Sequence, residues 1–309
     1  MSDRHVIVGA GPVGTHLARL LAERGSEVVV VTRSGSTVTT PGRSVQSVAL
    51  DASDAEALSA VVEGAVALHN CANPGDYTTW ESVWPPLAGS LRTVAERTGA
   101  VLVVTGNLYP YGPVPGGRMV EGMPDAATDH KGALRARMWA DLAAAHAAGT
   151  LRAVEVRGSD YVGTGVGGNG HVTRVLPTAV RGKTAWVLDG ADQPHSWTDV
   201  LDVARALAAV AERPATWGRI WHVPTNAPRT LREAITDTLA SVGRPPVPVR
   251  VLPRFLTRSA GLVSPLLREL NELAYQRIAP YVLDSGASMQ ALDLEPTPWL
   301  EVCRRTAVL

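Results

Sequence analysis

Short apolar runs alternate with amphipathic stretches along the first half of the chain. Six runs rich in Val, Leu or Ala have the length and composition of buried strands: His5–Val8, Glu27–Thr32, Ser44–Leu50, Ala65–Asn70, Ala100–Thr105 and Leu151–Arg157. Four stretches with helical character lie between them: Thr15–Arg24, Asp54–Val62, Trp80–Thr98 and Gly132–Ala148. Apolar strands separated by helices are typical of a parallel sheet covered on both faces. The pattern therefore predicts an α/β protein with a Rossmann-type doubly wound parallel sheet.

A glycine-rich turn joins the first predicted strand to the first predicted helix. Residues 9–14 read Gly9-Ala-Gly11-Pro12-Val13-Gly14, a Gly-x-Gly-x-x-Gly pattern. The first glycine permits a tight turn, the second lets the backbone approach a pyrophosphate, and the third lets helix and strand pack closely. The helix N-terminus offers unpaired N–H groups to the anion. Its place between a strand and a helix predicts dinucleotide binding, although such a turn also occurs in α/β proteins that bind nothing.

The pattern changes after Arg157. A glycine-rich loop over 158–170 precedes a predicted helix (Val172–Arg181), a strand (Thr184–Leu188), a helix (Thr198–Glu212), a strand (Arg219–Val223), a strand-like proline-rich stretch (Pro245–Pro253) and helices over 254–279. We expect a dinucleotide-binding core over residues 1–158, its sheet completed by parts of 196–224. Residues 159–195 and 225–309 are expected to form a smaller C-terminal substrate lobe.

The end of the second predicted strand indicates which dinucleotide is preferred. Arg33 stands where a NAD-preferring site has an acidic residue that bonds the ribose 2′-hydroxyl. An arginine suits a 2′-phosphate instead, and Ser34 and Ser36 add hydroxyl donors. The sequence thus favours NADP over NAD, the alternative being that Arg33 is merely solvated.

Two further strand ends supply candidate cofactor contacts. Asp51 follows the third strand, where it could meet an adenine amino group, and Asp54 is a plausible helix N-cap. Cys71, Ala72 and Asn73 follow the fourth strand, and small residues there would let a dinucleotide lie across the sheet edge. Packing is the favoured interpretation of Cys71, because nothing nearby would lower the pKa of its thiol.

Composition excludes several classes of partner. Lys and Arg total 29 and Asp and Glu total 29, with a pI near 7.1, so no charge excess points to nucleic acid or an anionic membrane. No apolar run approaches the ~20 residues of a membrane-spanning helix, and the early first strand leaves no room for a signal peptide. Cys71 and Cys303 lack disulfide or metal-ligand spacing. We expect a cytoplasmic protein that acts on a small molecule and binds no metal.

The order of these parts resembles the extended short-chain dehydrogenase/reductase family, the sugar-nucleotide epimerase and dehydratase group. The landmarks span almost the whole chain: Gly9–Gly14, 51–54 (DASD), 70–74 (NCANP), 105–112 (TGNLYPYG), 157–163 (RGSDYVG), 196–202 (SWTDVLD) and 296–299 (PTPW). The resemblance implies a nicotinamide dinucleotide, with Ala52, Ala72 and Thr105 among its contacts. It also implies a possible homodimer through the helices Trp80–Thr98 and Gly132–Ala148. The family's first fingerprint glycine would fall at Val8, which is a departure.

The catalytic residues depart further from the family. Its acid–base pair is Tyr-x-x-x-Lys, and the chain's two lysines, Lys131 and Lys183, each have an alanine four positions earlier. The chain therefore contains no such pair. In register, the family's tyrosine falls at Lys131, its lysine at Arg135, and its catalytic serine or threonine at Asn107.

Other residues could replace the missing pair. Lys131 is a cation suited to stabilising a developing alkoxide, Tyr109 is a phenol on the loop after the fifth strand, and Asn107 could hold the substrate oxygen. Lys131 could equally bind the ribose hydroxyls of the cofactor. By family register Tyr161 and His195 would face the substrate, and His195 is either a proton donor near neutral pH or a hydrogen-bonded structural residue.

Three functions remain open from the sequence. The favoured one is an NADP-dependent oxidoreductase, epimerase or dehydratase-like enzyme with a non-standard acid–base group, acting on an unknown carbonyl or sugar-type small molecule. The second is a catalytically silent dinucleotide-binding sensor or scaffold, supported by the missing Tyr-x-x-x-Lys. The third is a flavin protein, because GAGPVG also resembles FAD-binding openings, although Arg33 argues against it.

Overall fold

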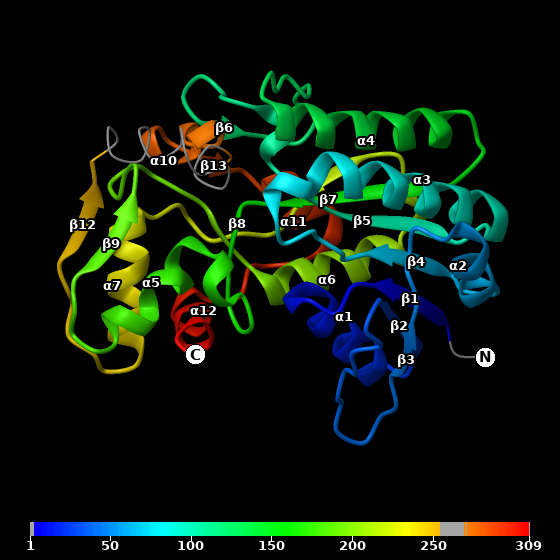
Figure 1. The fold of residues 1–309 in the computed structure, drawn as a ribbon, viewed down its shortest axis with the longest axis horizontal. Helices are drawn as coiled ribbons and strands as arrows, with labels where there is room; N and C mark the ends of the chain where they lie inside the picture. Colours follow the sequence, from blue (N-terminus) through cyan, green and yellow to red (C-terminus); the bar gives the residue numbers. More distant parts are fainter. Residues whose placement is uncertain (1–2, 254–268, 270, 309) are drawn as a thin grey trace. The chain divides into compact units, whose positions relative to one another are not determined.

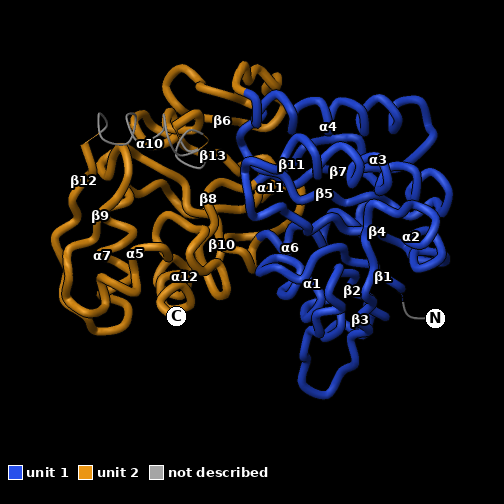
Figure 2. The backbone as a smooth tube through the Cα atoms, in the orientation of Figure 1, with its two compact units in different colours: residues 1–110, 130–157, 203–221 blue, residues 111–129, 158–202, 222–309 orange. Residues whose placement is uncertain are grey.

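The computed structural model describes residues 3–253, 269 and 271–308, and they divide into two compact units. The first unit comprises residues 1–110, 130–157 and 203–221, and the second comprises 111–129, 158–202 and 222–309 (Figure 2). Residues 111–129 thus group with the second unit, whereas the sequence interpretation counted them with the first. The expected domain limits stay a prediction.

A seven-stranded sheet forms the centre of the first unit, with the order β11-β7-β5-β4-β1-β2-β3. The strands are β1 (Arg4–Val8), β2 (Glu27–Thr32), β3 (Gln46–Ala49), β4 (Ala67–Asn70), β5 (Val101–Asn107), β7 (Ala153–Gly158) and β11 (Ile220–His222). The pairs β1–β2, β1–β4, β2–β3 and β4–β5 are all parallel. This strand order is that of the doubly wound fold, which confirms the predicted fold class.

Helices cover both faces of this sheet (Figure 1). They are α1 (Pro12–Glu23), α2 (Ala55–Val62), α3 (Trp80–Thr98), α4 (His130–Ala147) and α6 (Val200–Ala211). Val6 and Val8 of β1 pack in one core cluster with side chains of α2, α3 and α4, whereas Ile7, which points to the opposite face, is also fully buried. Strands buried on both faces explain why the apolar runs are continuous rather than alternating.

Local signals set the ends of these helices. Asp54 caps α2 by accepting hydrogen bonds from the backbone N–H groups of Glu56 and Ala57, both at 3.1 Å, as predicted. Helix α1 begins at Pro12, three residues before the predicted start, because proline is tolerated in the first turn of a helix. Helix α4 begins at His130 rather than Gly132, so that Lys131 lies within its first turn.

The second unit is built from short strand pairs and helices. Its strands pair in parallel as β8 (Asp160–Val162) with β10 (Trp197–Asp199), β9 (Ala185–Leu188) with β12 (Val249–Leu252), and β6 (Arg118–Met119) with β13 (Val282–Leu283). Its helices are α5 (His171–Ala179), α7 (Leu231–Ser241), α10 (Tyr275–Ile278), α11 (Gly286–Leu292) and α12 (Trp299–Thr306). Thr198 therefore lies in a strand and not at the start of the predicted helix. Most of the helices expected over 254–279 lie outside the described residues.

Candidate functional site

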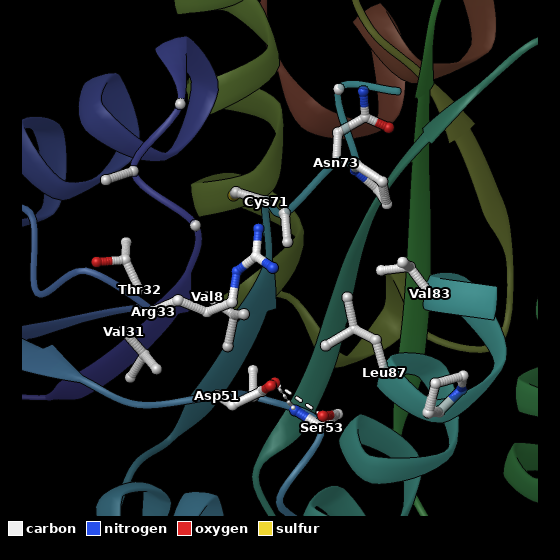
Figure 3. Close-up of a pocket in the computed structure, with 18 of the residues that line it drawn as sticks. Val8, Val31, Thr32, Arg33, Asp51, Ser53, Cys71, Asn73, Val83 and Leu87 are labelled. Carbon is white, nitrogen blue, oxygen red and sulfur yellow. Dashed lines mark hydrogen bonds between the residues drawn. The ribbon is translucent and has the colours of Figure 1, made fainter. Parts of the chain in front are cut away.

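A cavity of about 680 Å³ lies at the carboxyl ends of β1 to β4 in the first unit (Figure 3). Here β1 has β2 on one side and β4 on the other, which is the point where the strand order reverses. Ligands of doubly wound sheets bind at such switch points. Val83, Pro86 and Leu87 of α3 close one wall, and the strand ends supply most of the rest: Val8, Gly9, Ala10, Gly11, Thr32, Arg33, Leu50, Asp51, Ala52, Cys71, Ala72 and Asn73.

The structure explains the three glycines of the Gly-x-Gly-x-x-Gly turn in different ways. Gly9 has φ +105°, and a Cβ atom added there would lie 2.7 Å from the backbone nitrogen of Ala72. A Cβ atom on Gly14 would lie 2.0 Å from the carbonyl oxygen of Gly9. The protein's own packing therefore requires both glycines. Gly11, the N-cap of α1, lines the cavity, and a Cβ atom there would meet nothing within 4 Å.

Arg33 and Asp51 give the cavity its charged groups. Arg33 follows β2, is exposed and extends into the cavity (Figure 3). Asp51 accepts hydrogen bonds from the backbone nitrogen of Ser53 (3.0 Å) and from its hydroxyl (2.7 Å). These two hydrogen bonds, with a smaller contribution from the charge of Arg33, lower the pKa of Asp51. The cavity therefore holds a guanidinium and an ionised carboxylate.

Cys71 is a packing residue in this wall. It is buried, and burial raises the pKa of its thiol to about 12, so almost no thiolate exists at neutral pH. Its backbone also lies where a Cβ atom on Gly9 would clash. This agrees with the interpretation of Cys71 made from the sequence.

Not every predicted cofactor residue lines this cavity. Pro12, Val13 and Gly14 form the first turn of α1, and the Ser34 hydroxyl hydrogen-bonds that of Ser36 at 2.7 Å. None of these, nor Thr105 or Lys131, is among the cavity's lining residues. Their assignment to the cofactor therefore stays a prediction.

Helix α4 carries two buried cations, Lys131 and Arg135, at the positions where the sequence register expects a tyrosine and a lysine. Lys131 is fully buried, and its Nζ lies 5.6 Å from the ring centroid of Tyr77. Arg135, one turn later, lies over the ring of Trp84 at 4.5 Å and donates a hydrogen bond to the carbonyl oxygen of Thr105 at 2.9 Å. Both distances are within the range of cation–π contacts.

The end of β5 and the turn that follows it carry the remaining catalytic candidates, Asn107 and Tyr109. The Asn107 side-chain oxygen accepts a hydrogen bond from the backbone nitrogen of Tyr109 at 3.2 Å. The Tyr109 hydroxyl lies 3.0 Å from that of Tyr77. Sequence reasoning missed Tyr77, because its segment forms a short 3-10 turn (Tyr77–Thr79) with no motif, and only the fold places its hydroxyl beside that of Tyr109.

The second unit contains a buried group of titratable side chains. The His195 Nε2 atom lies 2.7 Å from an Asp160 carboxylate oxygen, and its Nδ1 lies 3.2 Å from the backbone carbonyl oxygen of Gln276. His171 Nε2 is 3.6 Å from the same Asp160 oxygen. Tyr161, the other predicted substrate residue, follows Asp160 on β8 and is half-buried. Asp160 and His171 were not predicted, because no motif links residues so far apart in the sequence.

Burial and charge set the protonation of this group. Burial lowers the pKa of His171 to about 4, although Asp160 acts in the opposite direction. Burial alone would raise the pKa of Asp160, but His171, the hydrogen-bonded His195 and Arg277 outweigh it and hold that pKa well below its usual range. At neutral pH the group therefore contains an ionised carboxylate and a neutral His171.

Two arginines lie on helix α5 or just after it. Arg174 donates hydrogen bonds to the backbone carbonyl oxygens of Gly168 (3.0 Å) and Asn169 (3.4 Å), and so holds the glycine-rich loop. Arg181, beyond the end of α5, is exposed.

Two further observations concern the described part of the chain. It contains no helix long and apolar enough to span a membrane. Within the same residues, no three His, Cys, Asp or Glu side chains are grouped so that they could hold a metal ion.

The fold and the cavity define a Rossmann-type α/β protein with a cavity at the switch point of the sheet. A model of the NAD dependent epimerase/dehydratase family matches residues 5–223, and the chain belongs to this family. The resemblance identified from the sequence is thereby confirmed.

Solved structures agree in fold. The chain is similar to UDP-N-acetylglucosamine 4-epimerase from Methanobrevibacter ruminantium M1, solved in complex with UDP-N-acetylmuramic acid, with a TM-score of 0.81 and 15% identity over 99% of this chain and 98% of that one. It is also similar to dTDP-glucose 4,6-dehydratase from Bacillus anthracis str. Ames in complex with NAD, with a TM-score of 0.79 and 15% identity over 99% and 96% of the two chains. At such identities the likeness establishes the fold alone. A search of curated proteins finds no match.

Proposed function

We propose that this protein is an NADP-dependent epimerase/dehydratase-like enzyme that uses an acid–base group other than Tyr-x-x-x-Lys. The observation that carries the proposal is the open space at Gly11. The protein's own packing does not require a glycine there, since a Cβ atom would meet open space, yet Gly11 lines the cavity at the N-terminus of α1. A backbone approached closely by a pyrophosphate accounts for it.

Arg33 supports NADP over NAD. Its guanidinium extends into the cavity from the end of β2, where it could form charge-assisted hydrogen bonds with a 2′-phosphate. Ser34, the next residue in the chain, adds a hydroxyl. Asp51 is an acceptor for the adenine amino group, and Ala52, Cys71, Ala72 and Asn73 provide the small surface along which the dinucleotide lies. Several solved neighbours are described as NAD complexes, so NAD is the alternative that the experiment must separate.

The catalytic roles follow from the loop after β5 and from α4. The nicotinamide supplies a hydride acceptor and donor. Tyr109 exchanges the proton of the substrate hydroxyl, Asn107 orients the substrate oxygen, and the buried Lys131 stabilises the negative charge that develops on it. Thr105 and Lys131 also contact the cofactor, and the substrate is an unidentified carbonyl or sugar-type molecule. The assignment of Tyr161 and His195 to the substrate stays a prediction.

Titration calorimetry with NADPH, NADH and FAD tests the cofactor proposal. We expect Arg33→Ala to weaken NADPH binding about 10- to 100-fold, because one charge-assisted hydrogen bond contributes about 1.5–3 kcal/mol. NADH binding should change little. Arg97→Ala, which removes an exposed cation in the last turn of α3, is the matched control and should change neither affinity.

Gly11→Ala gives an independent test of the same cavity. The variant should retain the wild-type melting temperature, because nothing lies within 4 Å of the added methyl group, yet lose dinucleotide binding. Absence of dinucleotide binding by the wild-type protein would overturn the proposal. Equal affinities for NADPH and NADH, unaffected by Arg33→Ala, would overturn the preference for NADP.

A catalytically silent dinucleotide sensor is the second candidate function. It is favoured by α4, which carries Lys131 and Arg135 in place of an acid–base tyrosine and its lysine. Turnover assays with NADP and UDP-glucose, UDP-galactose, UDP-N-acetylglucosamine and dTDP-glucose separate the two candidates. An enzyme should lose its turnover in Lys131→Met, whereas a sensor should bind NADPH and NADP with different affinities and convert none of these substrates.

A further inference from the structure

Tyr77 and Tyr109 form a hydrogen-bonded phenol pair in the first unit. Their hydroxyl oxygens are 3.0 Å apart, and both side chains are half-buried. Tyr77 comes from the turn that follows β4, and Tyr109 from the turn that follows β5, so two neighbouring strands bring the hydroxyls together. Asp76 and Thr79, on either side of Tyr77 in sequence, line the cavity.

The surroundings hold Tyr77 firmly in place. Asp76 caps its turn by accepting hydrogen bonds from the backbone nitrogen of Thr78 (2.9 Å) and from its hydroxyl (2.7 Å). The Trp80 ring packs against both tyrosine rings, at centroid distances of 5.0 Å to Tyr77 and 6.2 Å to Tyr109. Trp80 is itself anchored by a 3.1 Å hydrogen bond from its indole nitrogen to the carbonyl oxygen of Pro74. A pair packed in this way loses little side-chain entropy when it binds a reacting group.

A buried cation completes the arrangement. The Lys131 ammonium lies 5.6 Å from the centre of the Tyr77 ring and is fully excluded from solvent. A buried positive charge over the Tyr77 ring stabilises negative charge on the phenol pair more strongly than the same charge would in water. Phenol, phenol and ammonium thus come from three separate segments of the chain.

We propose that Tyr77 is the positioning residue for Tyr109: its hydroxyl donates a hydrogen bond to the Tyr109 oxygen and, with Lys131, stabilises the Tyr109 phenolate. The pair and the cation together replace the Tyr-x-x-x-Lys that the chain lacks. This inference rests on the proposed function, in which Tyr109 is the acid–base residue that contacts the substrate.

The proton balance of the step is simple. The substrate hydroxyl gives its proton to the Tyr109 phenolate while the attached carbon loses a hydride, with its electron pair, to an oxidised nicotinamide dinucleotide. A carbonyl group results. Tyr77 keeps its own proton throughout the step. Only its hydrogen bond with Tyr109 changes, so Tyr77 is neither consumed nor oxidised.

A spectrophotometric pH titration of tyrosinate absorbance tests the pair without substrate or cofactor. In the wild-type protein we expect one phenol to ionise about one pH unit or more below the others, a tenfold difference in the ionisation constant. Tyr77→Phe and Lys131→Met should each shift this early phase to higher pH, and Tyr109→Phe should remove it. Tyr111→Phe, which removes a hydroxyl in the same turn that lies 2.9 Å from the Nε2 atom of His222, is the matched control and should leave the phase in place.

Turnover measurements then separate a positioning role from a structural one. In Tyr77→Phe the alkaline shift of the pH–kcat profile should match the spectroscopic shift, with the melting temperature unchanged. An early phase that persists unaltered in Tyr77→Phe, or that is absent from the wild type, would overturn the inference even if NADPH binds. If the wild-type protein binds no dinucleotide in the calorimetric titrations, the proposed function is overturned instead. The tyrosinate titration still decides, on its own, whether Tyr77 and Lys131 stabilise the Tyr109 phenolate.

Discussion

Acid should destabilise this protein through His171, and the size of the effect can be worked out from its surroundings. Burial lowers the pKa of His171 from 6.5 to about 4, while Asp160 opposes the shift and Arg277, His195 and Arg174 add to it. In the unfolded chain His171 recovers its ordinary pKa. Between about pH 6.5 and pH 4 the unfolded state therefore binds more protons than the folded state.

The sign and magnitude follow from linkage. When folding lowers the pKa of a basic group, the full stability is present above the pKa that the group has in the unfolded chain. That stability is lost as the pH falls toward the pKa of the group in the folded protein. A shift from 6.5 to about 4 corresponds to about 3 kcal/mol of unfolding free energy, and about 2 kcal/mol of this is lost between pH 7 and pH 4.5.

The perturbation that isolates this contribution is His171→Gln, which keeps a polar side chain but cannot be protonated. Urea unfolding followed by tryptophan fluorescence at pH 7 and pH 4.5 gives the free energy of unfolding of each variant. His171→Gln should lose about 2 kcal/mol less than the wild type between the two pH values. Burial also lowers the pKa values of His5 and His69, but their contributions are the same in both proteins and cancel.

His130→Gln is the matched control, because His130 is exposed and its Nε2 atom lies 2.8 Å from the surface carboxylate of Glu81. It should show the wild-type loss of stability in acid. Equal losses in wild type and His171→Gln would refute the reasoning, since they would mean that His171 titrates alike in the folded and unfolded states.

Two other predictions concern close packing. Gly14→Ala should cost about 2 kcal/mol or more in urea unfolding, because its methyl group would overlap the carbonyl oxygen of Gly9. Gly89→Ala in α3, with nothing within 4 Å, should be neutral or stabilising by up to about 1 kcal/mol, and a comparable loss in both would contradict this. Cys71 and Cys303 should resist a thiol reagent at pH 7 in the folded protein and react fully in denaturant, because burial raises the pKa values of their thiols to about 12 and about 11. Rapid labelling of Cys71 in the folded protein would show that the cavity wall opens, and rapid labelling of Cys303 would show that α12 separates from its neighbours.

The sheet was predictable because its central strands are buried on both faces. A run such as Glu27–Thr32 is apolar at successive positions, which is typical of a strand buried on both faces. The glycine turn after β1 marks where the first helix begins. Boundaries were harder where two signals compete. Proline at position 12 let α1 start earlier than its apolar pattern suggested, and Thr198 joined a strand because its backbone pairs with Tyr161.

The candidate site was predictable only where one short segment carries the chemistry. The fingerprint glycines and Arg33 lie at strand ends that the sequence marks clearly. The sequence does not mark Tyr77 in this way, because its partners Tyr109 and Lys131 are far away in the chain. They meet Tyr77 only after the sheet has formed. The same holds for Asp160 and His195, which come together through the pairing of β8 with β10.

The strand order of the first unit has a consequence for synthesis on the ribosome. Strand β7 lies between β5 and β11, and all of its residues are buried in the finished sheet. Since Ile220 is translated long after Gly158, the emerging chain carries β7 for a time as an edge strand with an unpaired row of backbone groups. Any nascent chain that stops before residue 220 keeps that edge open. Completion of the seven-stranded sheet is therefore timed by translation of the segment that follows β10, and truncated products of this gene should aggregate or recruit chaperones.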